Sequence, residues 1–296
     1  MISVAVPTLD RPGYVRGCLE RLLDGDVLPS EILVIDQSAG DETAEVVAAL
    51  GSDVIRLVRH SPPSASGARN HAVQLAGGDY VALLDDDVEI PPDWLRNVQE
   101  ELRRFGGPDA LYGDIRPSDP PSDRKALPVS TFAVDAPRVW TTPVAPDRLG
   151  FGGHMVVRQA AFLALGGFDE RLGPGSPFFG AEDMDFNYRL MAAGYRAASS
   201  PNIWIIHLQW RPQEEIPRLY YRYNIGFAGF CAKHLRARDW RVLRLFGRHL
   251  MGDARMLASA VRRRSRLRVR AAGYRSAGTW RGLAMGLRAF GGRPRG

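Results

Sequence analysis

The sequence predicts an α/β fold, with a mixed, mainly parallel β-sheet flanked by helices and a basic helical extension after it. Short apolar runs of β character alternate with helical patterns through the first hundred residues, as in parallel βαβ units. The run at 80–84 ends in three consecutive carboxylates, Asp85, Asp86 and Asp87. Residues 1–210 carry 18 basic and 29 acidic side chains, a net charge of −11, whereas residues 211–296 carry 21 and 4, a net charge of +17.

Each predicted element rests on hydrophobic periodicity bounded by turn residues. Glycine pairs close the helical patterns that end before Gly77 and Gly166, and proline favours the first turn of the helix expected from Pro92. The stretch 114–150, rich in Pro, Asp and Ser, predicts a long loop. The expected strands are 2–7, 31–36, 54–58, 80–84 and 203–206, and the expected helices are 14–23, 42–50, 66–76, 92–105, 162–165, 181–193 and 216–235, with further helix from 239 onward.

These elements group into one domain at 1–215, with a first half at 1–113 and a second half at 114–215, and a helical, Arg-rich extension at 216–296. A hydrophobic content of 45% excludes a disordered chain. Two distant cysteines predict neither a disulfide framework nor a cysteine metal site, which fits a reducing cytoplasm. The first residues lack a signal-peptide pattern, and no apolar run is long enough to cross a bilayer.

The three carboxylates at 85–87 indicate a cation site. Adjacent negative charges at the end of a buried strand repel one another, and a bound divalent cation offsets that repulsion. We therefore expect Mg²⁺ or Mn²⁺, whose open coordination positions suit the oxygens of a diphosphate leaving group. The alternative is a solvated acidic turn without a ligand.

Other segments share the edge of the sheet where parallel strands end. They are Val6-Pro7-Thr8-Leu9-Asp10-Arg11, Val34-Ile35-Asp36-Gln37-Ser38, Ala65-Ser66-Gly67-Ala68-Arg69-Asn70, Gly166-Gly167-Phe168-Asp169-Glu170 and Phe179-Gly180-Ala181-Glu182-Asp183-Met184-Asp185. Together with 85–87, their order and spacing over residues 1–235 resemble the family 2 glycosyltransferases of the GT-A fold. The resemblance implies that 1–215 is the catalytic domain, with a nucleotide-sugar half at 1–113 and an acceptor half at 114–215.

The resemblance implies roles on the nucleotide side. Asp36 is expected to accept the N3–H of uracil or thymine, although it also suits a turn cap. Arg69 is expected to pair with phosphate or steer Asp85, although it also suits an exposed surface position. The remaining nucleotide-binding and metal-binding residues implied are Pro7, Thr8 and Asp10 around base and ribose, Asp85 near the ribose and metal, Asp86 in support, and Asp87 as the principal metal ligand.

The resemblance also implies an acceptor side. Asp183 is expected to act as general base beside Glu182, because an acceptor hydroxyl is a poor nucleophile until a carboxylate takes its proton. Neighbouring Glu182 and Asp185 should raise the basicity of Asp183, while a helix N-terminus should lower it. His207 is expected either as a metal ligand or as a structural histidine. Gly153, His154 and Trp204 are expected near the sugar or acceptor, with buried packing as the alternative for Trp204.

The implied reaction is inverting, non-processive transfer from a UDP- or dTDP-linked sugar to a hydroxyl of a cell-envelope glycan or lipid-linked glycan. Processive relatives carry a Gln-x-x-Arg-Trp motif and membrane spans, neither of which is found. A sugar-phosphate nucleotidyltransferase is the rival enzyme class, but the first strand runs into Pro-Thr-Leu-Asp rather than a Gly-rich phosphate loop. No G-x-G-x-x-G follows a strand, which disfavours a dinucleotide-binding dehydrogenase.

The basic extension has two interpretations. The run 262–270 alone would suit a nucleic-acid-binding protein. However, Trp280, Leu283, Ala284, Leu287 and Phe290 recur at helical spacing beside arginines, as in an interfacial helix. We expect binding to an anionic membrane surface and no nucleic acid, with a peripheral location at the cytoplasmic face; docking of this stripe onto the catalytic domain is the alternative, and oligomeric state stays open.

Overall fold

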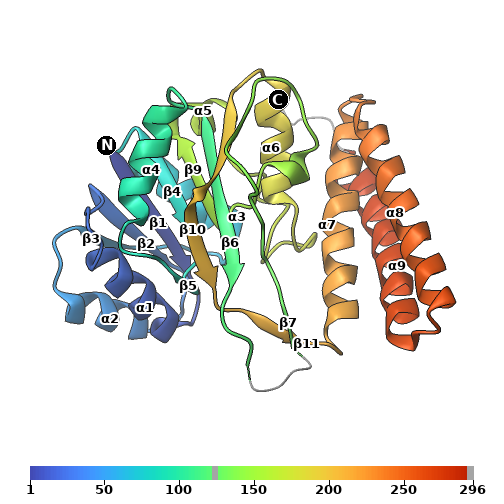
Figure 1. Cartoon of the computed structure of the whole chain (residues 1–296), viewed down its shortest axis with the longest axis horizontal. Helices are drawn as coiled ribbons and strands as arrows, with labels where there is room; N and C mark the ends of the chain where they lie inside the picture. The colour runs from blue at the N-terminus through green and yellow to red at the C-terminus, as the bar shows by residue number, and fades with distance from the viewer. Residues whose placement is uncertain (122–125, 292–296) are drawn as a thin grey trace.

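The computed structural model describes residues 1–121 and 126–291. Its main sheet has the strand order β3-β2-β1-β4-β9-β6-β10-β5, with β8 also paired to β10, and β11 pairs with β7 in a small second sheet. The pairs β1–β2, β1–β4, β2–β3 and β6–β10 are parallel, whereas β9 runs antiparallel between β4 and β6. The predicted mixed, mainly parallel sheet flanked by helices is confirmed (Figure 1).

The strands β1, β2, β4 and β9 follow from apolar runs that are buried along most of their length. β1 and β4 lie side by side in the sheet and end at the same edge, so the carboxylates after β4 meet the loop after β1. The strand bounds are β1 Ile2–Thr8, β2 Glu31–Asp36, β3 Ile55–Arg59, β4 Tyr80–Leu84, β5 Val88–Glu89, β6 Ala110–Pro117, β7 Ala126–Pro128, β8 Arg138–Trp140, β9 His154–Arg158, β10 Ala197–His207 and β11 Trp210–Pro212.

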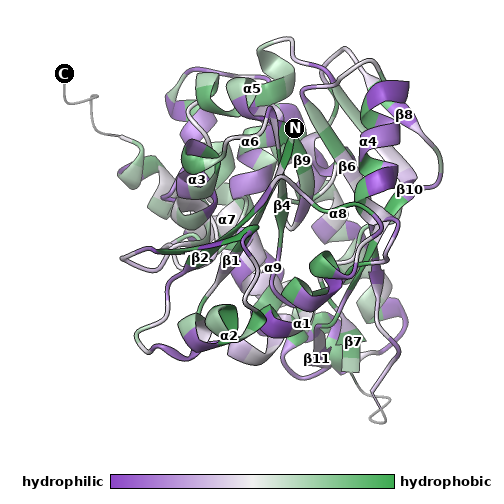
Figure 2. Cartoon of the chain, turned by 90° about the vertical axis from the view of Figure 1, so that its left-hand side faces the viewer, coloured by the Kyte–Doolittle hydropathy of each residue, from purple (hydrophilic) through white to green (hydrophobic). Residues whose placement is uncertain are grey.

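Helices cover both faces of the sheet. One hydrophobic cluster joins the sheet to α1, α2 and α4, and another joins its opposite face to α3, α5 and α6. Figure 2 shows the central strands as predominantly hydrophobic ribbon between these layers. The bounds are α1 Pro12–Leu23, α2 Glu42–Leu50, α3 Ala65–Leu75, α4 Trp94–Arg104, η1 Pro146–Arg148, α5 Gln159–Ala164 and α6 Glu182–Ala192.

The C-terminal extension consists of three long helices that stand together at one side of the molecule (Figure 1). They are α7 Ile216–Arg236, α8 Val242–Arg262 and α9 Arg266–Ala289. A third hydrophobic cluster contains Ile225 and Phe230 of α7 together with Leu172 and Phe178, so the extension shares a core with the loop before α6. In the described part of the chain, none of the helices combines the length and apolar character that a bilayer crossing needs.

The prediction of one long loop at 114–150 is wrong for the residues described. β6 continues to Pro117, and β7, β8 and η1 follow. These pieces are short and lack periodicity; β7 is held by pairing with β11 and β8 by pairing with β10, partners that lie far away in sequence. The expected helix start at Pro92 is also displaced, because α4 begins at Trp94.

Candidate active site

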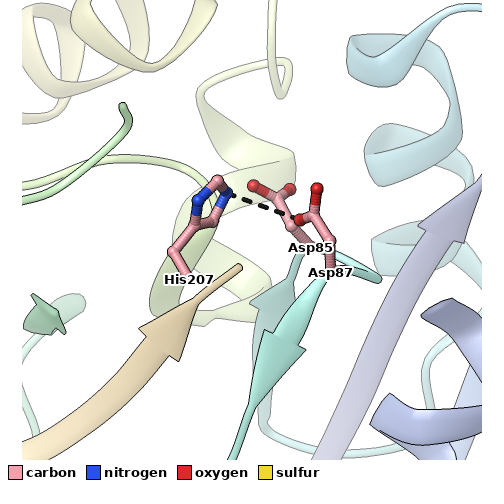
Figure 3. A group of neighbouring side chains, drawn as sticks. All are labelled: Asp85, Asp87 and His207. Carbon is pink, nitrogen blue, oxygen red and sulfur yellow. Dashed lines mark ion pairs between the residues drawn. The ribbon is translucent and has the colours of Figure 1, made fainter. Parts of the chain in front are cut away.

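Asp85, Asp87 and His207 form a potential metal-binding group at the edge of the sheet. One ligand atom from each of the three side chains lies within 4.8 Å of the other two. Antiparallel pairing of β10 with β5 sets His207 opposite Val88, which brings its ring to the carboxylates that follow β4. His207 Nε2 lies 3.4 Å from Asp87 Oδ1 (Figure 3). The structure thus brings His207 together with the acidic cluster, as the metal-ligand interpretation requires.

Positive and polar groups compensate the acidic cluster. Arg11, which the sequence analysis did not single out, places Nη2 2.5 Å from Asp86 Oδ1 and Nη1 2.8 Å from Asp87 Oδ2. Gln209 Nε2 donates a hydrogen bond to Asp87 as well. Arg11 lies in the loop after β1 and Gln209 lies just after β10, and both segments reach this edge of the sheet. Their position next to strand ends was the one sequence signal that could have indicated them.

Asp86 is buried beneath this surface and supports its neighbours. Its carboxylate accepts a hydrogen bond of 2.7 Å from Thr8 Oγ1 and has no exposed side-chain area. Burial raises the pKa of Asp86 to about 6, against the opposing effect of Arg11. The position fits the supporting role expected for Asp86 and joins Thr8 at the end of β1 to the cluster.

The residues present fit a hard divalent cation. Two carboxylates and one imidazole form an oxygen-rich ligand set that suits Mg²⁺ or Mn²⁺. The Asp85 side chain is 28% exposed, whereas those of Asp87 and His207 are nearly buried, so the set opens toward solvent on the Asp85 side. Asp85, Asp87 and His207 are the residues that would hold the ion.

Arg69 connects the metal-binding group to the second acidic pair. Its Nη2 lies 2.5 Å from Asp85 Oδ1, and its Nη1 lies 3.2 Å from Glu182 Oε1. The side chain is 7% exposed, which rules out the surface alternative. A buried guanidinium between two carboxylates is stabilised by both and fixes their separation.

Asp183 lies at the N-terminus of α6 beside Glu182. Its Oδ2 accepts a hydrogen bond of 3.2 Å from Gly152 N, and its Oδ1 accepts one of 2.7 Å from Met184 N. Burial raises the pKa of Asp183, and these backbone donors oppose the shift. Burial, followed by the charge of Asp183, raises the pKa of Glu182 to about 7. The basicity of Asp183 is raised as expected, but the largest cause is burial rather than the charge of the neighbouring acids.

Asp185 contributes differently from the expectation. It accepts hydrogen bonds of 2.8 Å from each of Arg189, Lys233 and His234, and these partners hold its pKa well below the ordinary value despite complete burial. Because it points toward α7 and is neutralised there, Asp185 is not among the main causes of the raised pKa of Asp183. It anchors α6 to the extension instead.

The backbone before α6 is held in an unusual conformation. Phe179 and Ala181 have φ values of 62° and 73°, in the left-handed region that side-chain-bearing residues rarely adopt. A Cβ at Gly226 of α7 would collide with the carbonyl groups of Gly180 and Phe178. The glycine therefore allows α7 to approach the segment that leads directly into Glu182 and Asp183.

The predicted nucleotide side lies at the ends of β1 and β2. Thr8 pairs with Asp36 in the register of these strands. Asp36 is buried, accepts a hydrogen bond of 2.9 Å from Ser38 N, and lies 2.8 Å from Nη1 of Arg59, whose side chain is 41% exposed. Asp10, with φ of 54°, donates its backbone N–H to Ser38 Oγ. Pro7 precedes Thr8 in β1, so all these residues share one edge with the acidic cluster.

The three residues expected near sugar or acceptor differ in their surroundings. A Cβ at Gly153 would overlap the Asp85 carboxylate, so only glycine fits there. His154 is 1% exposed, accepts from Trp94 Nε1 at 3.0 Å and lies 3.2 Å from the Asp114 carbonyl; burial lowers its pKa to about 4. Trp204 carries Arg116 over its ring and lies on the strand face opposite His207. The expected contact of these residues with sugar or acceptor stays a prediction.

A cavity of about 630 Å³ lies apart from this site, between the C-terminal half of α6, α8 and the segment before η1. None of the predicted site residues lines it. The lining includes Tyr188, Met191, Trp240, Arg244, Leu245 and Arg248.

The fold and the strand-end acidic site define the class of protein. Residues 3–148 match the profile of the family described as Glycosyl transferase family 2. This match covers just under half of the chain and confirms the resemblance to the family 2 glycosyltransferases that the motifs predicted.

Two relatives from Rhizobium meliloti (strain 1021) are similar in sequence. The succinoglycan biosynthesis protein ExoA is 24% identical over 255 residues, which cover 78% of this chain and 69% of ExoA. The succinoglycan biosynthesis protein ExoM is 32% identical over 151 residues, covering 50% of this chain and 46% of ExoM. The chain thus spans less than half of the length of ExoM.

Two solved structures share the fold. Mannosyltransferase PcManGT from Pyrobaculum calidifontis, in complex with GDP-Man and Mn²⁺, has a TM-score of 0.59 at 20% identity and covers 98% of this chain and 85% of that one. S. aureus TarS 1-349, in complex with UDP-GlcNAc, has a TM-score of 0.59 at 16% identity, and the match covers 94% of this chain and 90% of the TarS chain. These likenesses support the GT-A fold.

Proposed function

We propose that this enzyme transfers a sugar from a nucleotide diphosphate to an acceptor hydroxyl, with a divalent cation bound by Asp85, Asp87 and His207. The observation that carries the proposal is Arg69, which contacts both Asp85 and Glu182 and so joins the metal-binding group to the acid pair of α6. A site for the leaving diphosphate and a base for the incoming hydroxyl then adjoin one another.

In the proposed reaction, Asp183 Oδ takes the proton of the acceptor hydroxyl as that oxygen bonds to the anomeric carbon. The bond from this carbon to the diphosphate oxygen breaks, and the diphosphate leaves with the electron pair. A single displacement inverts the configuration. Bound Mg²⁺ or Mn²⁺ would supply neutralising charge to the diphosphate. Arg69 holds Asp85 and Glu182 in place, and the Gly152 N–H orients Asp183.

The donor class is supported by the solved relatives, which bind UDP-GlcNAc and GDP-Man. We propose UDP- or dTDP-linked sugar for this chain because Asp36 lies at the end of β2, beside Thr8, where it would accept the N3–H of a pyrimidine base. Arg59 lies against this carboxylate and would border the same base.

The acceptor is proposed to be a glycan or lipid-linked glycan of the cell envelope. Exposed aromatic rings flank the acid pair: Phe179 is 38% and Tyr223 is 45% exposed. A Cβ at Gly180 would lie 3.8 Å from Tyr223 Cδ1, so this ring lies beside the segment that leads into Glu182 and Asp183. Aromatic faces suit the apolar faces of sugar rings. The succinoglycan relatives support a polysaccharide pathway.

We also propose that the protein works at the cytoplasmic face of a membrane, to which the basic extension attaches it peripherally. The net charge of +17 over residues 211–296 supports attraction to anionic lipid, and a lipid-linked acceptor would be presented at that surface.

The test is a screen of nucleotide sugars for donor hydrolysis and transfer in Mn²⁺, with Asp183→Asn as the diagnostic variant. Asp183→Asn should retain nucleotide binding and lose transfer by roughly a thousandfold, within the range for removal of a general base. Asp147→Asn, an exposed substitution in η1, is the matched control. Retained transfer in Asp183→Asn would remove this residue from the base role.

A further inference from the structure

Helix α8 presents three faces with different chemistry. Residues three, four or seven apart share one face of an α-helix. Its inner face carries Val242, Phe246, His249, Asp253 and Ala260, of which Val242, Asp253 and Ala260 are buried. The other two faces are exposed, one apolar and one basic.

The inner face fixes the rotation of α8 about its axis. Phe227 of α7 stacks on His249 at 4.2 Å between ring centroids. Asp253 accepts from Arg275 of α9, with Arg275 Nη2 2.6 Å from Asp253 Oδ1. A buried ion pair has little freedom to change partners. The exposed apolar face of α8 is therefore held outward and is not needed for packing of the helices.

The apolar face forms a continuous row, which we call the α8 ridge. Leu243, Met251, Leu257 and Val261 are 48%, 52%, 43% and 60% exposed. Such large apolar exposure repeated at helical spacing is uncommon on a protein that contacts only water. The α8 ridge comprises Leu243, Met251, Ala254, Leu257, Ala258 and Val261.

A row of arginines borders the α8 ridge on one side. The row consists of exposed arginines at spacings of four and seven residues. They are Arg244, Arg248, Arg255 and Arg262. Within residues 1–121 and 126–291, none of the four forms an ion pair, whereas Arg241 and Arg275 pair with aspartates. Their charges are available to an anionic partner.

Helix α9 behaves differently from the sequence expectation. Gly278, Gly282 and Gly286 face α7, where a Cβ would collide with atoms of that helix. Phe290 packs on Phe178 at 5.5 Å between ring centroids. The expected stripe is thus divided: Phe290 docks onto the catalytic domain and Leu283 is half-buried, while Trp280, Ala284 and Leu287 are exposed. The Trp280 ring contacts Phe246 of α8.

We infer that the α8 ridge lies in the interfacial layer of an anionic lipid bilayer, with its leucine, methionine and valine side chains among the acyl chains and the arginine row at the level of the phosphates. An apolar row bordered by unpaired arginines is complementary to that layer in both chemistry and charge. Nucleic acid would engage the arginines but leave the apolar row in water. The inference deepens the proposed peripheral location, and membrane binding through α8 does not require sugar transfer.

The experiment measures co-sedimentation of the full chain with vesicles of phosphatidylcholine alone or with about a third phosphatidylglycerol. Wild type should sediment with the anionic vesicles and remain in solution with the neutral ones. Met251→Glu/Val261→Glu should lose sedimentation, and Arg244→Gln/Arg255→Gln should weaken it roughly twenty-fivefold, at about fivefold for each arginine near the surface. Matched controls are Leu28→Glu/Leu163→Glu and Arg56→Gln/Arg103→Gln, exposed positions on other elements.

Two further readings separate the possible outcomes. Thermal unfolding and donor hydrolysis should be unchanged in the ridge variants, because the altered side chains lie on the surface and far from the acid pair in the sequence. If wild type hydrolysed none of the donors, the proposed function would be contradicted, while the vesicle experiment would still test membrane binding through α8. Sedimentation that is indifferent to anionic lipid or to the ridge substitutions, or tight binding of duplex nucleic acid at physiological salt in its place, would overturn the inference.

Discussion

The guanidinium of Arg69 lies 2.5 Å from the carboxylate of Asp85 and spans the distance between the strand-end cluster and helix α6. Its other nitrogen reaches Glu182 at 3.2 Å. Two acidic groups that are far apart in the sequence are thereby held in one site, and the charge and geometry of each depend on the same side chain.

Glu182 should make stability depend on pH. Burial raises the pKa of Glu182 from 4.5 to about 7, so the folded state holds its proton more tightly than the unfolded state. The cost of ionising this group in the folded protein is absent below the unfolded value, grows as the pH rises through the interval between the two, and is complete above about 7. The free energy of unfolding of Glu182→Gln, taken relative to that of wild type, should therefore increase by up to about 3 kcal/mol between pH 5 and pH 8.

Urea unfolding of the metal-free protein at the two pH values measures this gain. Glu20→Gln, an exposed substitution on α1, is the control and should differ from wild type equally at both. A Glu182→Gln difference that does not vary with pH would show that the carboxylate is not buried as described.

Replacement of His207 should weaken metal binding. His207→Ala removes the nitrogen ligand while leaving Asp85 and Asp87, so Mn²⁺ affinity in the presence of nucleotide should fall by about tenfold or more. Isothermal titration of Mn²⁺ measures the change. Trp204→Phe, on the opposite face of the same strand, should bind Mn²⁺ as wild type does; equal losses in both variants would point to damage to β10 rather than to a lost ligand.

Replacement of Tyr223 should weaken binding of the acceptor and leave donor hydrolysis unchanged. Its ring is 45% exposed on α7 beside the acid pair. Tyr223→Ala should raise the KM for the acceptor by roughly tenfold, as expected for loss of about one ring-stacking contact. Donor hydrolysis without acceptor should stay constant. Tyr14→Ala, equally exposed at 45% on α1, is the control, and a parallel fall of donor hydrolysis in Tyr223→Ala would contradict an acceptor role.

Gly226 should be intolerant of a side chain. A Cβ there would meet the Gly180 oxygen at 2.7 Å, whereas a Cβ at Gly247 of α8 meets nothing within 4 Å. Gly247→Ala should stabilise the protein by about 1 kcal/mol through helix propensity. Gly226→Ala should instead destabilise it and reduce transfer, because the loop into Asp183 is displaced. Chemical unfolding and transfer rates of the two variants, compared side by side, test this; a stabilised Gly226→Ala with full activity would show that α7 does not position the loop.

The acidic residues of the site can be recognised in the sequence, whereas the groups that neutralise them cannot. Asp85, Asp87, Glu182 and Asp183 follow recognisable strand or helix boundaries. Arg11 and Gln209 occupy unremarkable loop positions, and their role depends on where the loop after β1 and the end of β10 meet. The role expected of Asp185 was wrong for the same reason, since its partners Lys233 and His234 belong to α7 and are distant from it in the sequence.

The amino-acid sequence alone determined the alternation of strands and helices, the carboxylates at the strand ends and the basic extension, because periodicity, turn residues and charge are local properties. Tertiary structure decided that Arg69 is buried between two acids, that His154 is hydrogen-bonded to Trp94 in the interior, and that α8 turns an apolar row outward. Those outcomes depend on which faces meet across long sequence separations, where each contact is set by packing and by the neutralisation of buried charge.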